Sequence, residues 1–414
     1  MARTATPRSS TTRCCIVGGG PAGMMLGYLM ARAGVDTVVL EKHADFLRDF
    51  RGDTVHPSTL RIVDELGLRD DFLRLPHQKL RRLTGLFGDE AVRLGDFSGL
   101  PERYAFIAMM PQWDFLNFLA DRGRALPHLQ IRMRSQAEGL IERDGRVVGV
   151  RGRDVDGAFE IRAALTIGCD GRHSTVREAA GLPREDIGAP IDVMWFRIPR
   201  DAGELDDTLA RVTPGRIVVT LDRGDYWQCA FVIAKGAAES LKARAIEDFR
   251  AEVAKAAPIL APHVDAIASW DDVKLLSVSV DRLTRWSRPG LLCIGDAAHA
   301  MSPVGGVGIN LAIQDAVAAA NALAEPLRDD ALVDADLDRV RERRLFPTRV
   351  TQAFQVQMQR NVLAPVISGE NDTLEVPWPM RMLTALPVLQ RLLARVVGMG
   401  VRPEHVRSPV ARAD

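Results

Sequence analysis

The chain alternates between two kinds of apolar pattern. Runs in which nearly every residue is apolar occur at residues 14–17, 35–40, 164–169 and 291–294. Such runs are typical of strands in a parallel sheet that is covered on both faces. A helix-compatible segment at residues 21–33 lies between the first two runs. The order of strand, helix and strand predicts an α/β fold with a Rossmann-like unit at its start.

The middle of the chain has a different pattern. Strand-like runs occur at residues 193–198, 215–221, 227–234 and 273–280, and a helix is expected at about residues 241–257. We therefore expect an antiparallel-sheet domain inserted into the α/β fold. The predicted boundaries are a disordered tail at 1–12, the α/β domain at 13–185 and 286–330, the inserted domain at 186–285, and a C-terminal helical region at 331–414.

Composition restricts the classes of function. Lys plus Arg (54) equals Asp plus Glu (54), so the overall charge gives no argument for nucleic-acid binding. The 5 cysteines include no C-x-x-C pair, which favours a reducing cytoplasm, and no metal site is predicted. The first twelve residues lack the apolar centre of a signal peptide, and we see no apolar run long enough to span a bilayer. A cytoplasmic globular enzyme fits this composition.

A glycine-rich turn follows the first strand. Gly18, Gly20 and Gly23 satisfy G-x-G-x-x-G, with Pro21 and Ala22 between the last two glycines. The first glycine permits a tight turn, the second lets the backbone approach a pyrophosphate, and the third lets helix and strand pack closely. The helix that follows adds unpaired N–H donors and a positive dipole end.

The second strand ends at Glu41, which Lys42 follows. A carboxylate about 20 residues after the glycines is expected to hold ribose hydroxyls. The alternative is an ordinary strand–helix–strand unit with a surface glutamate. Turn, helix, strand and acid agree, so we favour dinucleotide binding.

Two later strands also end in an acid beside a glycine. Asp170-Gly171 is followed by Arg177 in a short predicted helix, and Gly295-Asp296 is followed by a glycine loop. Ligands bind at such strand ends in open α/β sheets. The residues alone leave a second interpretation open, in which the first acid only shapes a turn and Arg177 forms a surface salt bridge. A packed role is favoured for His299.

The glycine loop opens a long alanine-rich helix. Its N–H groups can point at a negatively charged or carbonyl-rich ring. The loop positions of interest are Pro303, Gly305, Gly306, Gly308, Ile309 and Asn310.

Together these motifs resemble the group A flavoprotein monooxygenases, the FAD-dependent aromatic hydroxylases that include p-hydroxybenzoate hydroxylase. The resemblance spans roughly residues 13–330 and follows the family's motif order. Arg51 and Gln112 also fall where that family places flavin-contacting residues. The implied fold is a Rossmann-like FAD-binding domain with an inserted antiparallel-sheet substrate domain and a C-terminal helical segment.

The resemblance also implies roles. One FAD is bound tightly, with NAD(P)H and dioxygen as cosubstrates, and a small aromatic substrate is hydroxylated through a flavin C4a-hydroperoxide. The three glycines of the turn approach the pyrophosphate, Glu41 the ribose and Asp296 the ribityl or pyrophosphate side of the cofactor. Asp170 and Arg177 belong to a motif that serves both FAD and NAD(P)H. The implied catalytic positions beside the flavin ring are Pro303, Gly306, Gly308 and Asn310.

Other features leave alternatives open. The tyrosine pair of p-hydroxybenzoate hydroxylase cannot be mapped onto this chain, which has 3 tyrosines. The candidate substrate contacts in the central sheet are Arg197, Arg216, Tyr226, Trp227 and Gln228. A reductase of the geranylgeranyl-reductase type, a flavin-dependent halogenase and a non-catalytic nucleotide-binding module are the competing functions.

Assembly is also left open, a homodimer included. Residues 377–401 carry three arginines and no acid, which suits either a lipid contact or, as we favour, packing on their own domain.

Overall fold

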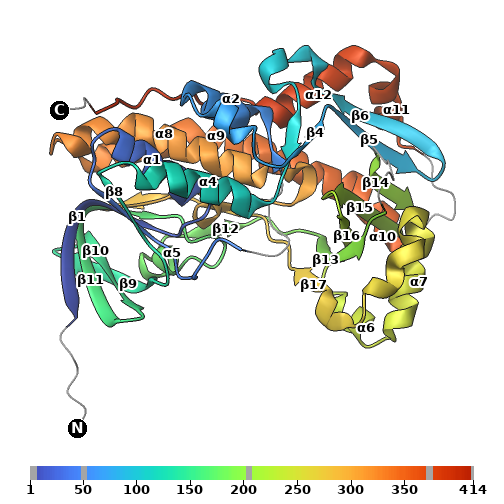
Figure 1. Cartoon of the computed structure of the whole chain (residues 1–414), viewed down its shortest axis with the longest axis horizontal. Helices are drawn as coiled ribbons and strands as arrows, with labels where there is room; N and C mark the ends of the chain where they lie inside the picture. The colour runs from blue at the N-terminus through green and yellow to red at the C-terminus, as the bar shows by residue number, and fades with distance from the viewer. Residues whose placement is uncertain (1–6, 48–53, 202–207, 370–375, 412–414) are drawn as a thin grey trace, which may run out of the picture.

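The computed structural model describes residues 7–47, 54–201, 208–369 and 376–411. Two large sheets lie at opposite ends of the molecule, and the helices α8 (Gly308–Arg328) and α9 (Asp334–Met358) extend between them (Figure 1). The apolar runs at residues 14–17, 35–40, 164–169 and 291–294 all contribute strands to one of these sheets. This confirms the predicted parallel strands, because their side chains are buried on both faces.

That sheet has eight strands, and its parallel part runs in the order β20-β11-β1-β2-β8. Helices α1 (Pro21–Arg32) and α4 (Gln112–Arg124) pack beside it, together with α8. The strands are β1 (Arg8–Val17), β2 (Thr37–Leu40), β8 (Leu129–Arg132), β9 (Gln136–Arg143), β10 (Arg146–Asp154), β11 (Gly157–Gly168), β19 (Ser287–Arg288) and β20 (Leu291–Cys293).

The predicted tail is wrong for its second half. Residues 8–12 form the start of β1 and pair in parallel with residues 159–163 of β11. Their side chains are mostly exposed, so no apolar pattern marked them as a strand. The backbone hydrogen bonds to β11 and the ion pairs of Arg8 with Asp154 and Asp156 hold this segment in place.

The second sheet has seven strands in the order β17-β13-β16-β15-β14-β5-β6. Five of them come from the predicted inserted domain, whereas β5 (Arg82–Phe87) and β6 (Glu90–Asp96) come from the first part of the chain. Strand β5 joins β14 in parallel, a long-range pairing that local pattern does not encode. The other strands are β13 (Ile191–Pro199), β14 (Thr208–Thr213), β15 (Arg216–Asp222), β16 (Tyr226–Ala234) and β17 (Lys274–Leu276).

Two smaller sheets connect these parts. Strands β3 (Thr54–Val55), β7 (Ile107–Met109) and β4 (Gln78–Leu80) form one, and β12 (Arg184–Asp186), β18 (Asp281–Leu283) and β21 (His299–Ala300) form the other. The helix predicted near residues 241–257 is two helices, α6 (Ala238–Lys242) and α7 (Ile246–Ala256). The remaining α-helices are α2 (Pro57–Glu65), α3 (Arg69–Phe72), α5 (Thr175–Ala179), α10 (Ala364–Ser368), α11 (Trp378–Ala385) and α12 (Pro387–Met399).

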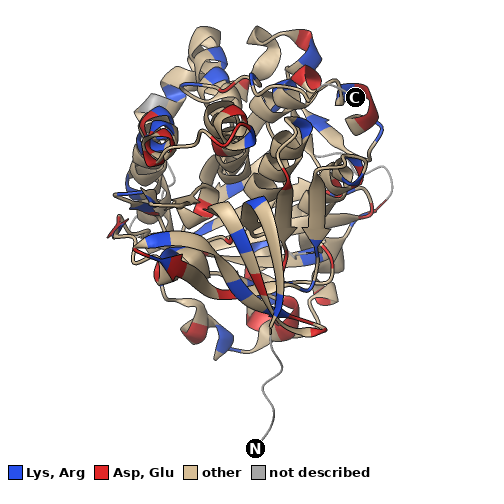
Figure 2. Cartoon of the chain, turned by 90° about the vertical axis from the view of Figure 1, so that its left-hand side faces the viewer, with Lys and Arg blue, Asp and Glu red and all other residues tan. Residues whose placement is uncertain are grey.

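One helical stretch, residues 304–328, is long and apolar enough to cross a membrane by length and composition. It lies inside the protein, where 72% of its most apolar window is buried against neighbouring elements such as α1 and α9. Such burial is typical of a helix in the core of a folded domain. On the face of the molecule in Figure 2, basic and acidic residues are interspersed.

Candidate active site

The glycine turn combines two packing constraints with one open position. Gly18 has φ +106°, and a Cβ there would lie 2.4 Å from the Cys169 carbonyl oxygen. A Cβ on Gly23 would lie 1.9 Å from the Gly18 carbonyl oxygen. At Gly20, by contrast, no atom of the described residues other than its chain neighbours lies within 4 Å of the Cβ position. Gly18 and Gly23 are therefore required by the fold, whereas Gly20 leaves room for a ligand.

Glu41 follows β2 and is 8% exposed. Its carboxylate accepts hydrogen bonds from the backbone N–H groups of Gly19 (3.1 Å) and His43 (2.9 Å). The acid is thus held against the glycine turn, at the strand end where a ribose contact is expected. Sequence analysis missed Gly19, where a Cβ would lie 2.9 Å from that of Glu41. Lys42 is exposed.

The Asp170 motif has a structural role. The Asp170 carboxylate accepts hydrogen bonds from the Ser174 hydroxyl and, at 3.1 Å, from the Val176 N–H, so it caps α5. Burial raises its pKa, and these hydrogen bonds act in the opposite direction. Arg177 is 5% exposed and donates to the carbonyl oxygens of Arg172 (2.6 Å) and Ala297 (3.2 Å). The surface salt bridge considered for Arg177 is therefore wrong, because its guanidinium joins two strand-end loops in the interior.

Asp296 lies in the short helical turn η5 (Gly295–Ala297) and is only partly covered, with 34% of its side chain exposed. Arg172 donates from Nε to the carboxylate at 3.3 Å. A Cβ on Gly295 would approach Ala22 of the glycine turn at 3.2 Å. The three strand-end loops are thus in mutual contact, and Asp296 presents a carboxylate at their junction. Sequence analysis missed Arg172, although it follows Asp170-Gly171 directly.

The glycine loop before α8 has the backbone conformation that its sequence suggests. Gly305 and Gly306 have φ values of +78° and +63°, which favour glycine. A Cβ on Gly306 would lie 2.5 Å from Thr54 Oγ1, which donates to the Gly306 carbonyl at 2.9 Å. The N–H groups of the first turn of α8, which begins at Gly308, have no partner within the helix and are available to a ligand.

The Asn310 side chain is hydrogen-bonded to other parts of the protein. It is 3% exposed, and its amide accepts from the His56 N–H (2.9 Å) and the Thr59 hydroxyl (2.7 Å). The same amide donates to the Thr54 and Gly306 carbonyls. Each polar atom of the amide therefore helps to hold the loop to β3 and α2, and the catalytic role implied for Asn310 stays a prediction.

Three glutamines on α9 and just after it hold the other side of this loop. Gln355 donates to the Ser302 and Val304 carbonyls at 2.8 and 2.9 Å, and Gln352 donates to the Ala300 carbonyl at 3.1 Å. Gln359 donates to the Ser302 hydroxyl. All three are almost fully buried. Their spacing of three and four residues on one helix face was the available signal, which sequence analysis did not use.

A buried charged network lies behind the Asp296 loop. Asp315 accepts from the Gly295 N–H (3.1 Å), His299 Nε2 (2.6 Å) and Arg344 Nε (2.8 Å). Burial alone would raise the pKa of Asp315, but His299 and Arg344 hold it below its usual value. Arg344 also contacts Glu404 at 3.3 Å, so the network joins the loop to the C-terminal segment. His299 is 1% exposed, which confirms that it is packed.

The candidate substrate residues divide between the two faces of the seven-stranded sheet. Trp227 is 1% exposed in the core under α7, and Arg216 pairs with Glu252 of α7 at 2.8 Å. Strand alternation turns both side chains toward α7, and their proposed contact with substrate stays a prediction. Gln228 lies on the opposite face and accepts from Arg223 Nε at 3.1 Å. Arg197 lies over the Tyr226 ring at 5.1 Å.

Arg223, which contacts Gln228 on the opposite face, also acts on the charge of Asp114 in α4. Burial raises the pKa of Asp114 in the first turn of α4, and the charge of Arg223 acts against that rise. Gln112, the first residue of α4, is half-buried. Arg51 lies outside the described residues.

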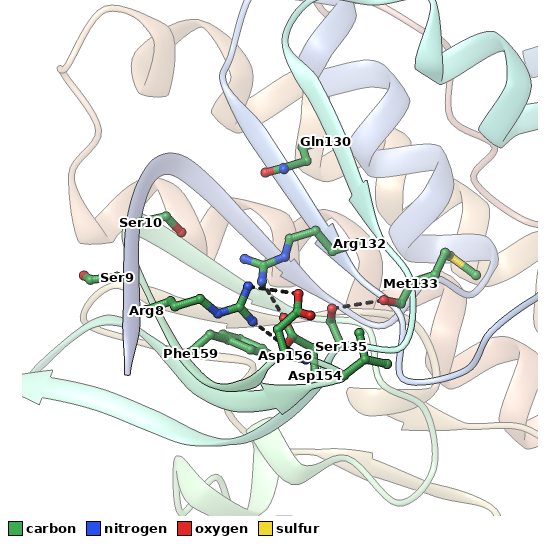
Figure 3. Close-up of a pocket in the computed structure, with 11 residues that line it drawn as sticks. Arg8, Ser9, Ser10, Gln130, Arg132, Met133, Ser135, Asp154, Asp156 and Phe159 are labelled. Carbon is green, nitrogen blue, oxygen red and sulfur yellow. Dashed lines mark hydrogen bonds and ion pairs between the residues drawn. The ribbon is translucent and has the colours of Figure 1, made fainter. Parts of the chain in front are cut away.

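A hollow of about 400 Å³ elsewhere on the surface is not this site (Figure 3). Arg8, Arg132, Asp154, Asp156 and Phe159 are among its lining, and none of its lining residues belongs to the loops described above. The two arginines pair with the two aspartates, and Arg132 also lies 4.8 Å from the Phe159 ring centre. Its charges are balanced internally, so it offers little to an ionic ligand.

The glycine turn, the carboxylates at two strand ends and the open helix N-terminus suit a dinucleotide with a flavin ring. The chain belongs to the FAD-binding family of group A flavoprotein monooxygenases: the family profile described as "FAD binding domain" matches residues 11–354. It is thus an FAD-dependent enzyme of the monooxygenase class.

Particular relatives agree with this family. The chain is 33% identical to 6-methylpretetramide 4-monooxygenase from Streptomyces rimosus, over 96% of this chain and 94% of that protein. It is 29% identical to a probable NADH-specific resorcinol 4-hydroxylase from Rhodococcus jostii, over 73% of this chain but 56% of the relative. The fold is also that of an anhydrotetracycline hydroxylase from Streptomyces rimosus, with TM-score 0.72, 23% identity, and coverage of 94% of this chain and 76% of that one.

Proposed function

We propose that this enzyme uses NAD(P)H and dioxygen to hydroxylate an aromatic substrate beside an FAD held at the three strand-end loops. The observation that carries the proposal is the open position at Gly20, between two glycines whose Cβ atoms would clash with the protein. That space, at the N-terminus of α1, suits the pyrophosphate of a dinucleotide cofactor. The monooxygenase relative matched over nearly its full length supports the reaction class.

Each part of the site would have a separate role in binding the cofactor. Gly20 and the N-terminus of α1 receive the pyrophosphate, and Asp296 accepts hydrogen bonds from cofactor hydroxyls. The first turn of α8 directs its N–H groups and dipole at the electron-rich end of the ring. When bound, the flavin supplies hydride acceptance from NAD(P)H and oxygen activation.

We place the substrate between these loops and the face of the seven-stranded sheet that carries Gln228. Leu221 and Met109 of β7 belong to an apolar cluster on this side of the sheet, and Trp195 packs against that cluster. Met109 lies just before Gln112, so this cluster connects the sheet with the flavin side of the molecule. An apolar enclosure of this kind keeps water away from the reacting centre.

The test is oxygen consumption with defined aromatic compounds. Purified holoenzyme is assayed with NADH and with NADPH against 6-methylpretetramide, anhydrotetracycline and resorcinol, the compounds named for its relatives. We expect one of these to accelerate NAD(P)H oxidation and to yield a product that carries one oxygen atom from labelled dioxygen. Reduction of a substrate without oxygen incorporation would refute the proposal and favour the reductase alternative.

A further inference from the structure

Helices α11 and α12 display apolar side chains to solvent. They lie at the edge of the molecule beside β5 and β6 (Figure 1). Among the described residues, many of the exposed large apolar side chains belong to this helix pair. We call them the α11–α12 face: Trp378 (72% exposed), Met382, Leu386, Val388 (68%), Leu392 (58%) and Val396.

The pattern of these residues is regular. Trp378 and Met382 are four residues apart in α11, and Val388, Leu392 and Val396 repeat that spacing in α12, whereas Leu386 lies between the two helices. Residues four apart lie on one side of a helix, so each helix carries an outward apolar stripe. A contiguous apolar surface of this kind marks an interaction site more often than scattered single residues do.

The helices are already anchored through their other side. Ala394 and Gly398 of α12 are buried, and a Cβ on Gly398 would lie 2.9 Å from both Phe97 and Pro57. Gln390 donates to the Leu383 and Thr384 carbonyls at 3.0 Å, which joins the two helices. The self-packing that we favoured from the sequence is therefore confirmed for the inner side, and it leaves the outer stripe uncovered.

Within residues 376–403 all charged side chains are basic, whereas the neighbouring strand β6 carries Glu90 and Asp96. Arg381, Arg391 and Arg395 are exposed, and each lies three residues after a residue of the apolar stripe. On a helix that spacing places them at the flank of the stripe. Residues 376–403 contain no acid. A two-fold contact between two copies of this face would bring six arginines together without a carboxylate from the same segment, which disfavours self-association.

We propose that the α11–α12 face docks this enzyme onto an anionic lipid surface. The apolar stripe with Trp378 at its start would enter the headgroup region, and the flanking arginines would meet lipid phosphates. A basic residue at such a surface contributes about 1 kcal/mol, so Arg391 and Arg395 together should favour anionic over neutral vesicles about 30-fold. The proposal does not depend on the substrate or on the reaction.

The experiment is vesicle co-sedimentation of the full-length holoenzyme. Vesicles of phosphatidylglycerol and phosphatidylcholine are compared with vesicles of phosphatidylcholine alone. We expect binding to the anionic vesicles that is lost, by at least about tenfold, in Val388→Glu/Leu392→Glu and reduced in Arg391→Gln/Arg395→Gln. Val155→Glu is the matched control, because Val155 is 73% exposed in the turn between β10 and β11.

Flavin absorbance of each variant establishes that it is folded before binding is measured. Failure to bind anionic vesicles, or equal binding by wild type and Val388→Glu/Leu392→Glu, would overturn the proposal. Light scattering tests the alternative occupant. If wild type does not bind vesicles but forms a dimer, and Val388→Glu/Leu392→Glu dissociates that dimer, this face is assigned to a second copy of the chain.

Discussion

His56 should make the stability of the fold depend on pH between about 6.5 and 4. Its ring is fully buried, with Nδ1 3.0 Å from the Val397 carbonyl of α12. Nε2 is buried and has no hydrogen-bond partner among the described residues. Burial lowers the pKa of His56 to about 4, against a smaller raising effect of the Val397 carbonyl. The ring is therefore neutral in the folded protein at pH 7, with its proton on Nδ1.

The magnitude follows from the difference between the folded and unfolded pKa values. The unfolded chain binds a proton at His56 near pH 6.5, whereas the folded chain resists it down to about 4. The contribution of neutral His56 to the free energy of unfolding is therefore fully present above pH 6.5 and is lost as the pH is lowered toward 4. Each unit of difference corresponds to about 1.36 kcal/mol, so the loss at pH 4 is about 3 kcal/mol.

The assay is urea unfolding of wild type and His56→Asn at several pH values from 7.5 to 4.5. Asparagine can donate to the Val397 carbonyl and does not titrate in this range. We expect wild type to lose between about 2 and 3 kcal/mol more than His56→Asn over this interval. His263→Asn is the control, because His263 is partly exposed and pairs with Asp201. Equal pH dependence in wild type and His56→Asn would refute the reasoning.

Three further predictions concern the cofactor site. Gly20→Val should fold, because its side chain meets no described protein atom, but it should purify with little FAD, because the side chain occupies the space proposed for the pyrophosphate. Gly18→Val should fail to fold, and full flavin occupancy in Gly20→Val would place the pyrophosphate elsewhere. Asp296→Ala should weaken FAD binding by roughly 10- to 150-fold in a fluorescence titration, and unchanged affinity would leave Asp296 a purely structural role. Gly306→Ala should lower the ratio of hydroxylated product to NAD(P)H consumed, with peroxide as the balance, because the new Cβ must displace Thr54 at the loop. Gly67→Ala, with a similar φ of +72° and open space, controls for backbone strain alone; equal coupling in the two variants would separate the loop from the flavin.

The local sequence pattern was sufficient to predict those elements whose conformation depends on residues close together in the chain. The continuous apolar runs predicted the buried parallel strands, because both faces of that sheet are covered. The glycine turn could be recognised because its backbone must bend sharply and approach both a strand and a ligand. The positive φ angles of Gly305 and Gly306 belong to the same class, since a loop that opens a helix in so few residues requires them.

Contacts between distant segments were not accessible in this way. Residues 8–12 carry no apolar pattern, and they form a strand because β11 supplies partners about 150 positions further along. The strands β5 and β6 join the seven-stranded sheet for the same reason. Arg177 looked like a surface or ligand residue, yet the carbonyls that bind it belong to loops that meet only in space.

The site shows the same division. Gly18, Gly20 and Gly23 share a motif, but the fold assigns packing to two of them and leaves the third open, because only the first and last approach other backbone. Asn310 and Trp227 have suitable chemistry for a ligand, but neighbouring elements use their polar atoms or bury their rings. A residue type and its spacing indicate what chemistry a chain can perform, whereas the direction in which each side chain points depends on strand alternation and packing across the whole structure.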